Sequence, residues 1–152
     1  MLAGEYCNRD VIIIGRSDSI LKAAKLMREH HVGDVLVVES VKGERTPIGI
    51  LTDRDIVVDV LAKYDHAHDI AIQDVFNNRL ITIHEKDDLM VAIKQMRLNG
   101  VRRIPVINDT GGLVGILSVE DVLDVITEQL MDIGQTLTNE KNNEEKLVAI
   151  SA

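Results

Sequence analysis

Apolar residues along the chain form short β-branched runs followed by helical faces, and this pairing occurs twice. The first half opens with the run Val11–Ile14 and the second half with Leu80–Ile83. After each run, apolar residues recur at spacings of three, four and seven positions, which predicts one buried face of a helix. These helical positions are Ile20, Ala23, Ala24 and Met27 in the first half, and Leu89, Ala92, Ile93 and Met96 in the second.

Each of these helices is bounded by residues that start and stop helices. Ser19 and Asp88 precede the first apolar positions and are expected to cap the two N-termini. Gly33 and Gly100 are expected to end the two helices.

Two further β-rich runs follow in each half, and a second helix is expected to begin at Thr52 or Ser118. The predicted strands are 35–39, 48–51, 104–107 and 113–117, with a hairpin loop at Asn108–Gly112. The apolar face of the second helix is predicted at Ile56, Val57, Val60 and Leu61 in the first half, and at Val122, Leu123, Val125 and Ile126 in the second.

The two halves are copies of one another. Ile12 and Met27 stand 69 positions before Ile81 and Met96, whereas Asp55 stands 66 positions before Asp121. The difference of three residues indicates an insertion within 39–47 of the first copy. The repeat predicts an α/β (α+β) fold of two β-α-β-β-α copies packed sheet to sheet around a pseudo-twofold axis.

The copies are placed at residues 1–64 and 72–133, with a connection at 65–71. Residues 134–152 are polar, and both a helical extension and a mobile tail fit their composition.

Composition narrows the classes of function. The chain has 152 residues and a formal net charge of −8, so generic binding to nucleic acid is not expected. Cys7 is the single cysteine, which excludes an intrachain disulfide and favours a cytoplasmic location. No apolar stretch approaches the length of about 18 residues that a membrane span requires, so no membrane association is expected.

One short motif occurs at the same place in both copies, namely Gly-x-x-Thr/Ser-x-x-Asp. It comprises Gly49, Thr52 and Asp55 in the first copy, and Gly115, Ser118 and Asp121 in the second. One interpretation is a capping box, in which the hydroxyl residue and the acid three positions later satisfy each other's backbone N–H groups. The other is a ligand corner, in which the carboxylate accepts from a sugar diol and the hydroxyl holds a phosphate oxygen beside the helix N-terminus.

This duplicated motif resembles the ligand motif of cystathionine-β-synthase (CBS) domains. The stretch Asp74-Val75-Phe76 resembles the opening of such a domain, and Arg102–Val106 resembles its basic-basic-x-Pro-Val strand. The resemblance covers about residues 5–130 and identifies the chain as a tandem CBS pair, or Bateman module.

The resemblance implies a regulatory module rather than an enzyme. Tandem CBS pairs bind AMP, ADP, ATP, NAD or S-adenosylmethionine between their copies, commonly form homodimers through their helices, and regulate a partner protein. Carried over to this chain, Asp55 and Asp121 would bind ribose, and Thr52 and Ser118 would lie at ribose or phosphate. The first strands would frame adenine through Ile12, Ile13, Ile14, Ile81 and Thr82, and the basic strand would contribute Arg102, Arg103, Ile104 and Pro105.

The two predicted sites are not expected to be equivalent. The first copy has Gly33-Asp34-Val35-Leu36 where the second has Arg102-Arg103-Ile104-Pro105. Arg102 and Arg103 are predicted to bind phosphate, although adjacent arginines also fit a structural role with their stems packed on the sheet.

Two alternatives remain open at this stage. The chain could be an interaction or dimerisation module whose nucleotide sites are vestigial. It could also be a metal-dependent enzyme that uses His30, His31, His66 or His68. Zinc-like spacing with cysteines is lacking around these histidines, so surface positions and no metal site are expected for them. A nucleophile–base–acid arrangement, a phosphate-binding loop and a catalytic carboxylate pair are also lacking, which argues against catalysis.

Overall fold

The structure is a computed structural model that describes residues 1–76 and 79–151. It has the predicted β-α-β-β-α order in each copy, arranged as two three-stranded sheets with their helices. The first copy contains β1 (Ile13–Gly15), α2 (Ile20–His30), β2 (Asp34–Val41), β3 (Glu44–Thr52), α3 (Asp53–Asp55) and the π-helix η1 (Ile56–Leu61). The second contains β4 (Ile83–His84), α4 (Leu89–Asn99), β5 (Arg103–Ile107), β6 (Leu113–Ser118) and α5 (Val119–Ser151). Three short helices connect or precede them: α1 (Ala3–Tyr6), η2 (Ala67–Asp69) and η3 (Ile72–Asp74).

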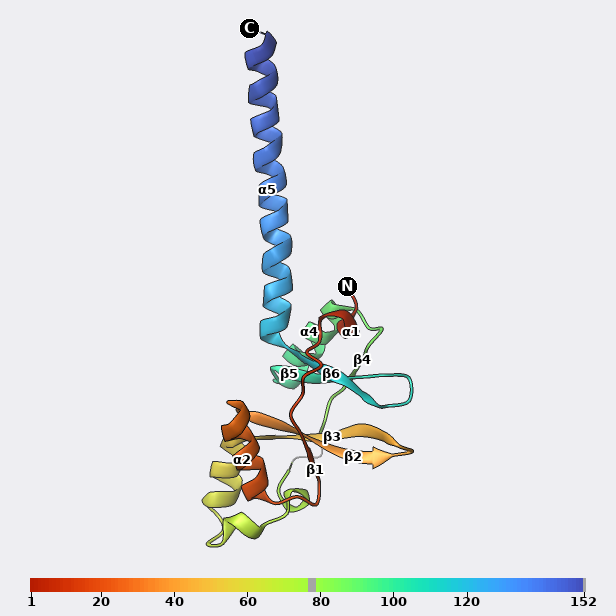
Figure 1. Cartoon of the computed structure of the whole chain (residues 1–152), viewed down its shortest axis with the longest axis vertical. Coiled ribbons are helices and arrows are strands. Elements are labelled where there is room, and N and C mark those ends of the chain that lie inside the picture. The colour runs from red at the N-terminus through yellow and green to blue at the C-terminus, as the bar shows by residue number, and fades with distance from the viewer. Residues whose placement is uncertain (77–78, 152) are drawn as a thin grey trace.

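Both sheets have the same topology, which confirms the repeat. In each sheet the first strand runs parallel to the second, and the second and third form an antiparallel hairpin. The two sheets lie one above the other in Figure 1, with β3 and β6 in contact between them. The first strands are shorter than predicted, since they begin at Ile13 and Ile83.

The caps of the two long helices follow from the residues at their ends. The Ser19 hydroxyl accepts from the Lys22 N–H at 3.2 Å, and the Asp88 carboxylate accepts from the Met90 N–H at 2.9 Å. Gly100 ends α4 with a φ of 65°, as predicted. The prediction for Gly33 was wrong, because α2 ends at His31 with a φ of 53°. His31 aligns with Gly100 in the repeat, so the same left-handed turn ends both helices, and histidine tolerates this conformation better than most residues.

Replacement of Ser19 by alanine is expected to destabilise the protein by about 1 kcal/mol, because the Lys22 N–H loses its acceptor. Thermal unfolding followed by circular dichroism measures this change. Ser17→Ala is the matched control, since Ser17 is exposed two residues earlier and should shift stability by less than about 0.5 kcal/mol. Equal stability of the two variants would show that the cap contributes nothing.

The insertion in the first copy lengthens the two strands of a hairpin, although the predicted strands end at residue 39 and begin again only at residue 48. Strands β2 and β3 continue to a two-residue turn at Lys42 and Gly43, whose φ values are 50° and 84°. Positive φ at both positions is the geometry of the tight turn that matches strand twist. The hairpin loop predicted at Asn108–Gly112 is confirmed, with the Asn108 side chain accepting from the Thr110 and Gly112 N–H groups.

Two hydrophobic cores lie on either side of the sheet contact, and each takes residues from the sequence of the other copy. Ala3 and Cys7 are buried in the core of the second copy, whereas Ile72 is buried in the core of the first, together with Ala67 of the connection. Figure 1 shows the N-terminal segment rising from β1 to lie beside α4. This exchange of segments packs the two halves against each other. The boundaries 1–64 and 72–133 therefore describe the sequence repeat and not the packing units.

The helix faces are partly as predicted. Met27 and Met96 are buried, with exposed fractions of 7% and 3%. In the second helix of the first copy, Ile56 and Val60 are buried but Val57 and Leu61 are exposed, so that half of the predicted face was wrong. This segment is a π-helix, in which the Ala62 N–H donates to the Val57 carbonyl five residues back.

The last helix extends far beyond both cores. In α5, Val122 and Val125 are buried, Ile126 is half-buried, and Leu123 is exposed although it was predicted to lie on the apolar face. The helix has 33 residues and is therefore about 50 Å long. Residues 134–151 thus continue the last helix, which ends at Ser151, and Ala152 lies outside the described residues. None of the described helices combines the length and apolarity needed to cross a bilayer.

Candidate functional site

The duplicated motif forms a capping box in both copies. The Thr52 hydroxyl accepts from the Asp55 N–H at 3.1 Å, and the Thr52 N–H donates to Asp55 Oδ2 at 2.9 Å. Ser118 and Asp121 make the equivalent bonds at 3.1 and 2.7 Å, and the Ser118 hydroxyl also donates to Asp121 Oδ2 at 2.6 Å. These bonds hold each hydroxyl and carboxylate at a strand–helix junction.

Each junction is bound to the start of the middle strand in its own sheet. The Asp53 N–H donates to the Gly33 carbonyl at 2.9 Å, and the Val119 N–H donates to the Arg102 carbonyl, also at 2.9 Å. The motif of the first copy is thereby held beside Gly33-Asp34, and the motif of the second beside Arg102-Arg103.

A cavity of about 740 Å³ lies between the two copies. Of the predicted site residues, the structure brings Thr52, Asp55, Ile81, Arg102 and Arg103 together in its wall. The described lining is Gly33, Asp34, Ile50, Thr52, Asp53, Arg54, Asp55, Arg79, Leu80, Ile81, Gly100, Val101, Arg102, Arg103 and Glu120. This volume suits a nucleoside-sized ligand, because small-molecule pockets commonly span about 300–1,000 Å³.

The other predicted site residues lie elsewhere. Ser118 and Asp121 are absent from the described lining of this cavity, and Thr82 faces a second cavity of about 490 Å³. Ile14, Ile104 and Pro105 are buried in the body of the protein, so only their backbone could reach a ligand. Ile12, which directly precedes β1, and Ile13, the first residue of β1, are half-buried. The ligand roles of these residues stay predictions.

Charged side chains of both signs line the larger cavity. Its wall holds the cations Arg54, Arg79, Arg102 and Arg103 and the anions Asp34, Asp53, Asp55 and Glu120. The formal charge of the wall is therefore balanced, although the whole chain carries −8. An anionic ligand meets much less repulsion here than elsewhere on the surface.

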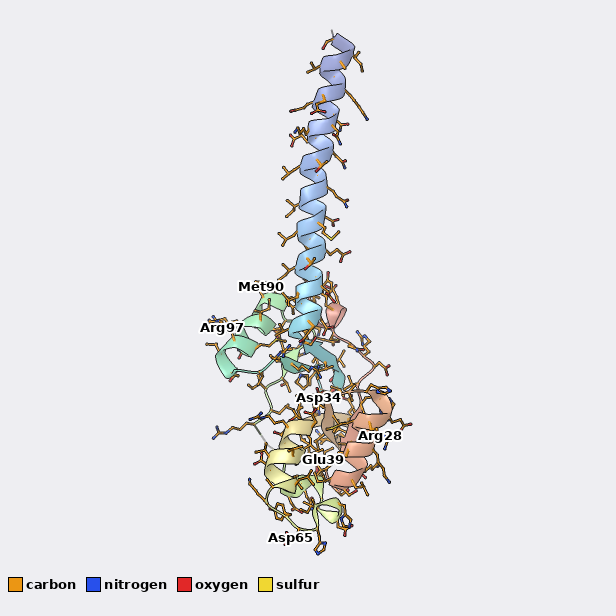
Figure 2. All side chains as sticks on the ribbon, turned by 90° about the vertical axis from the view of Figure 1, so that its left-hand side faces the viewer. Arg28, Asp34, Glu39, Asp65, Met90 and Arg97 are labelled. Carbon is orange, nitrogen blue, oxygen red and sulfur yellow. The ribbon has the colours of Figure 1, made fainter. Side chains whose placement is uncertain are left out.

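Two of the arginines are engaged by acids in the wall. Arg103 pairs with Asp34 and Arg102 pairs with Glu120. A backbone N–H and the nearby Arg102 cation hold the pKa of Glu120 below its ordinary value. The Arg103–Asp34 pair joins the two copies, and Figure 2 shows Asp34 between the two halves of the molecule.

Asp34 is a functional candidate that the motif search did not select. The signal that could have found it is the repeat itself, because Asp34 stands 69 positions before Arg103 and so occupies the same place in the other copy. Opposite charges at positions related by a pseudo-twofold axis can meet at that axis.

The recurring glycine of the motif has a structural function in the second copy. A Cβ atom on Gly115 would lie 2.6 Å from the Asn8 carbonyl oxygen and 2.7 Å from Cys7 Sγ. The Asn8 and Ile116 backbones exchange two hydrogen bonds at 2.8 and 2.9 Å. The backbone that approaches this glycine closely therefore belongs to the chain's own N-terminal segment.

The histidines of the metal hypothesis are exposed and dispersed. His30 and His31 lie at the end of α2, and the His66 and His68 rings meet edge to face with centroids 6.4 Å apart. His68 Nε2 lies 3.1 Å from Asp69 Oδ2. Within residues 1–76 and 79–151, no group of three or more His, Cys, Asp or Glu side chains is placed to hold a metal ion.

Comparison with known families gives one match that covers most of the chain. The family described as CBS domain matches twice, over residues 3–61 and 72–128. An uncharacterized protein of Methanopyrus kandleri is 36% identical over 122 residues. The match spans 80% of this chain but only 61% of that protein.

Solved structures share the two-copy arrangement. The CBS domain pair of protein MJ0100, in complex with 5-methylthioadenosine and S-adenosyl-L-methionine, is 23% identical with a TM-score of 0.71 and covers 85% of this chain and 98% of that one. Hypoxic Response Protein I with two coordinated zinc ions is 27% identical with a TM-score of 0.72 and covers 82% of this chain and 98% of that one.

Proposed function

This chain belongs to the CBS domain family, and we propose that it is a regulatory module that binds an adenosine-containing ligand in the cavity between its two copies. The candidate ligands are AMP, ADP, ATP, NAD and S-adenosylmethionine. The observation that carries the proposal is the convergence of Thr52, Asp55, Arg102 and Arg103 from both copies on one cavity of about 740 Å³.

The chemistry of the wall suits the parts of a nucleotide. The capping bonds use Oδ2 of Asp55, so Oδ1 is the oxygen proposed to accept from the ribose hydroxyls. Arg102 and Arg103 present planar cations that suit phosphate oxygens. Leu80, Ile81 and Ile50 supply the apolar surface against which an adenine ring can pack.

A second, non-equivalent site around Ser118 and Asp121 remains part of the proposal. Arg102 and Arg103 have no cationic counterpart in the first copy, where the equivalent positions are Gly33 and Asp34. A ligand at Ser118 and Asp121 would therefore meet different charges from a ligand at Thr52 and Asp55.

The module is proposed to act as a homodimer that signals to another protein rather than as an enzyme. Exposed apolar side chains on the body helices, including Val57, Leu61 and Met90, fit an interface between copies. In support of a non-catalytic role, both copies match a domain whose solved pair in protein MJ0100 holds small adenosine compounds. The cytoplasmic location stays a prediction from the single cysteine.

Ligand binding is expected to raise the melting temperature. A ligand at 100 times its dissociation constant stabilises the folded state by about 2.7 kcal/mol. For a chain of this size the shift is about 5–10 °C. A thermal-shift series with the five candidates, on protein shown by mass spectrometry to carry no co-purified small molecule, makes the measurement.

Asp55→Asn is the matched control for this experiment, because it keeps the size of the side chain and removes the charge. The shift produced by the effective ligand should shrink or vanish in this variant. If none of the five ligands moves the melting temperature, the clefts are vestigial and the chain is an interaction module.

A further inference from the structure

The part of α5 beyond the second core has an apolar stripe that no other part of the described chain covers. Every residue from Thr127 to Ser151 is exposed, and Figures 1 and 2 show the helix projecting from the body. Leu130, Ile133 and Leu137 are exposed by 64%, 59% and 62%. This segment lies almost wholly beyond the family match, which ends at residue 128, so the CBS fold does not account for it.

The apolar residues on this segment follow a heptad spacing. Leu123, Ile126, Leu130, Ile133 and Leu137 are separated by three, four, three and four positions. This alternation places all five side chains on one narrow face, which is the seam by which helices pair in coiled coils. Ile126 is half-buried against the second core, so the stripe runs without a break from the body onto the projecting helix.

The charges around the stripe suit a second copy of the same helix. The positions that flank the seam are uncharged, namely Thr127, Gln129, Gly134 and Thr136. The carboxylates of this stretch, Asp124, Glu128 and Asp132, occupy positions away from the seam. Two acidic chains, each with a net charge of −8, can therefore bring these faces together without opposing their carboxylates.

A solitary helix of this composition would be poorly stable. Gly134, Thr136, Thr138 and Asn139 are weak helix formers, and a helix in water gains most of its stability from packing an amphipathic face. Burial of the stripe against a partner supplies that stability. Glu140 and Glu144 occupy the next two seam positions, so the apolar contact ends at Leu137.

We propose that α5 associates with α5 of a second copy of this chain through Leu123, Ile126, Leu130, Ile133 and Leu137. This interface is separate from the body helices of the CBS copies and does not depend on the ligand cavity. It would hold two modules together whether or not the cavity is filled.

The test compares Leu130→Glu with Met131→Glu in the full chain. The two residues are neighbours and are exposed to similar degrees, 64% and 60%, but only Leu130 lies on the seam. Leu130→Glu is expected to weaken the association of α5 at least 100-fold, because each copy loses the burial of one leucine and places a carboxylate in the seam. Met131→Glu should leave the association unchanged.

Amide hydrogen exchange at about 1 µM and about 100 µM protein reports on α5 separately from any contact between the bodies. Protection of residues 127–137 should rise with concentration in the unaltered chain and in Met131→Glu, but not in Leu130→Glu. Sedimentation equilibrium should show stronger self-association in the same two samples than in Leu130→Glu. Protection that does not depend on concentration, or equal behaviour of the two variants, would overturn the proposal, and neither result would bear on ligand binding.

Discussion

Replacement of Gly115 by alanine is expected to destabilise the protein by about 3 kcal/mol. The added Cβ would lie 2.6 Å from the Asn8 carbonyl oxygen, which is backbone and cannot turn away. The N-terminal segment must then shift, which strains or breaks the two backbone hydrogen bonds between Asn8 and Ile116. The melting temperature should fall by about 6–12 °C.

The N-terminal segment offers a second measurement for this variant. Cys7 is buried against Gly115, and burial raises the pKa of its thiol, so the thiol should react slowly with a thiol reagent in the unaltered protein. Undocking of the segment in Gly115→Ala opens this buried site and should accelerate that reaction by about tenfold or more.

The same substitution at Gly134 is the control. A Cβ atom on Gly134 would have no neighbour within 4 Å, and alanine favours a helix more than glycine does. Gly134→Ala should leave the melting temperature of the body and the reactivity of Cys7 unchanged. If Gly115→Ala also leaves both unchanged, the N-terminal segment does not pack against β6.

Much of the fold could be predicted from the local pattern of apolar residues, and the predictions that were wrong have physical causes. Met27 and Met96 are buried as the helical period predicts, because apolar residues at that spacing lie on the side of the helix that faces the core. Val57 and Leu61 are exposed, and so is Leu123, which aligns with Val57 in the repeat, because apolar spacing alone does not show how wide the buried face of a helix is. Ile72 lies in the core of the other copy because exchange of segments depends on tertiary packing.

The site was predicted less completely than the fold. The motif identified Thr52 and Asp55 because strand–helix junctions depend on sequence over a few residues. Asp34 was missed because its importance comes from a partner 69 residues away in the chain. The two readings of the motif are compatible, since a capping box fixes a hydroxyl and a carboxylate at the edge of the cavity where a ligand would meet them.

Arg103→Ala is expected to weaken AMP binding by about 10–100-fold, because a hydrogen bond to a charged group contributes about 1.5–3 kcal/mol. This prediction rests on the proposed binding of an adenosine nucleotide in the larger cavity. Adenosine lacks the phosphate, so its affinity should change by less than about threefold, a difference of about 0.6 kcal/mol. Isothermal titration calorimetry with the two compounds separates a phosphate contact from a general disturbance of the cavity. Equal losses for AMP and adenosine would assign Arg103 to a structural role.

Asp34→Asn is expected to act in the opposite direction and to strengthen AMP binding. Asp34 pairs with Arg103 across the two copies, and its side chain is only 19% exposed, so the carboxylate competes with a phosphate for the same cation. Asparagine keeps the shape of the side chain but removes the negative charge, which frees Arg103 to bind the phosphate. The expected result is an affinity for AMP that rises by about three- to tenfold, with no change in the affinity for adenosine. The gain should disappear when Arg103→Ala is combined with Asp34→Asn, because the freed cation is then absent. A gain that persists in the double variant would mean that Asp34 acts on the ligand by charge repulsion alone.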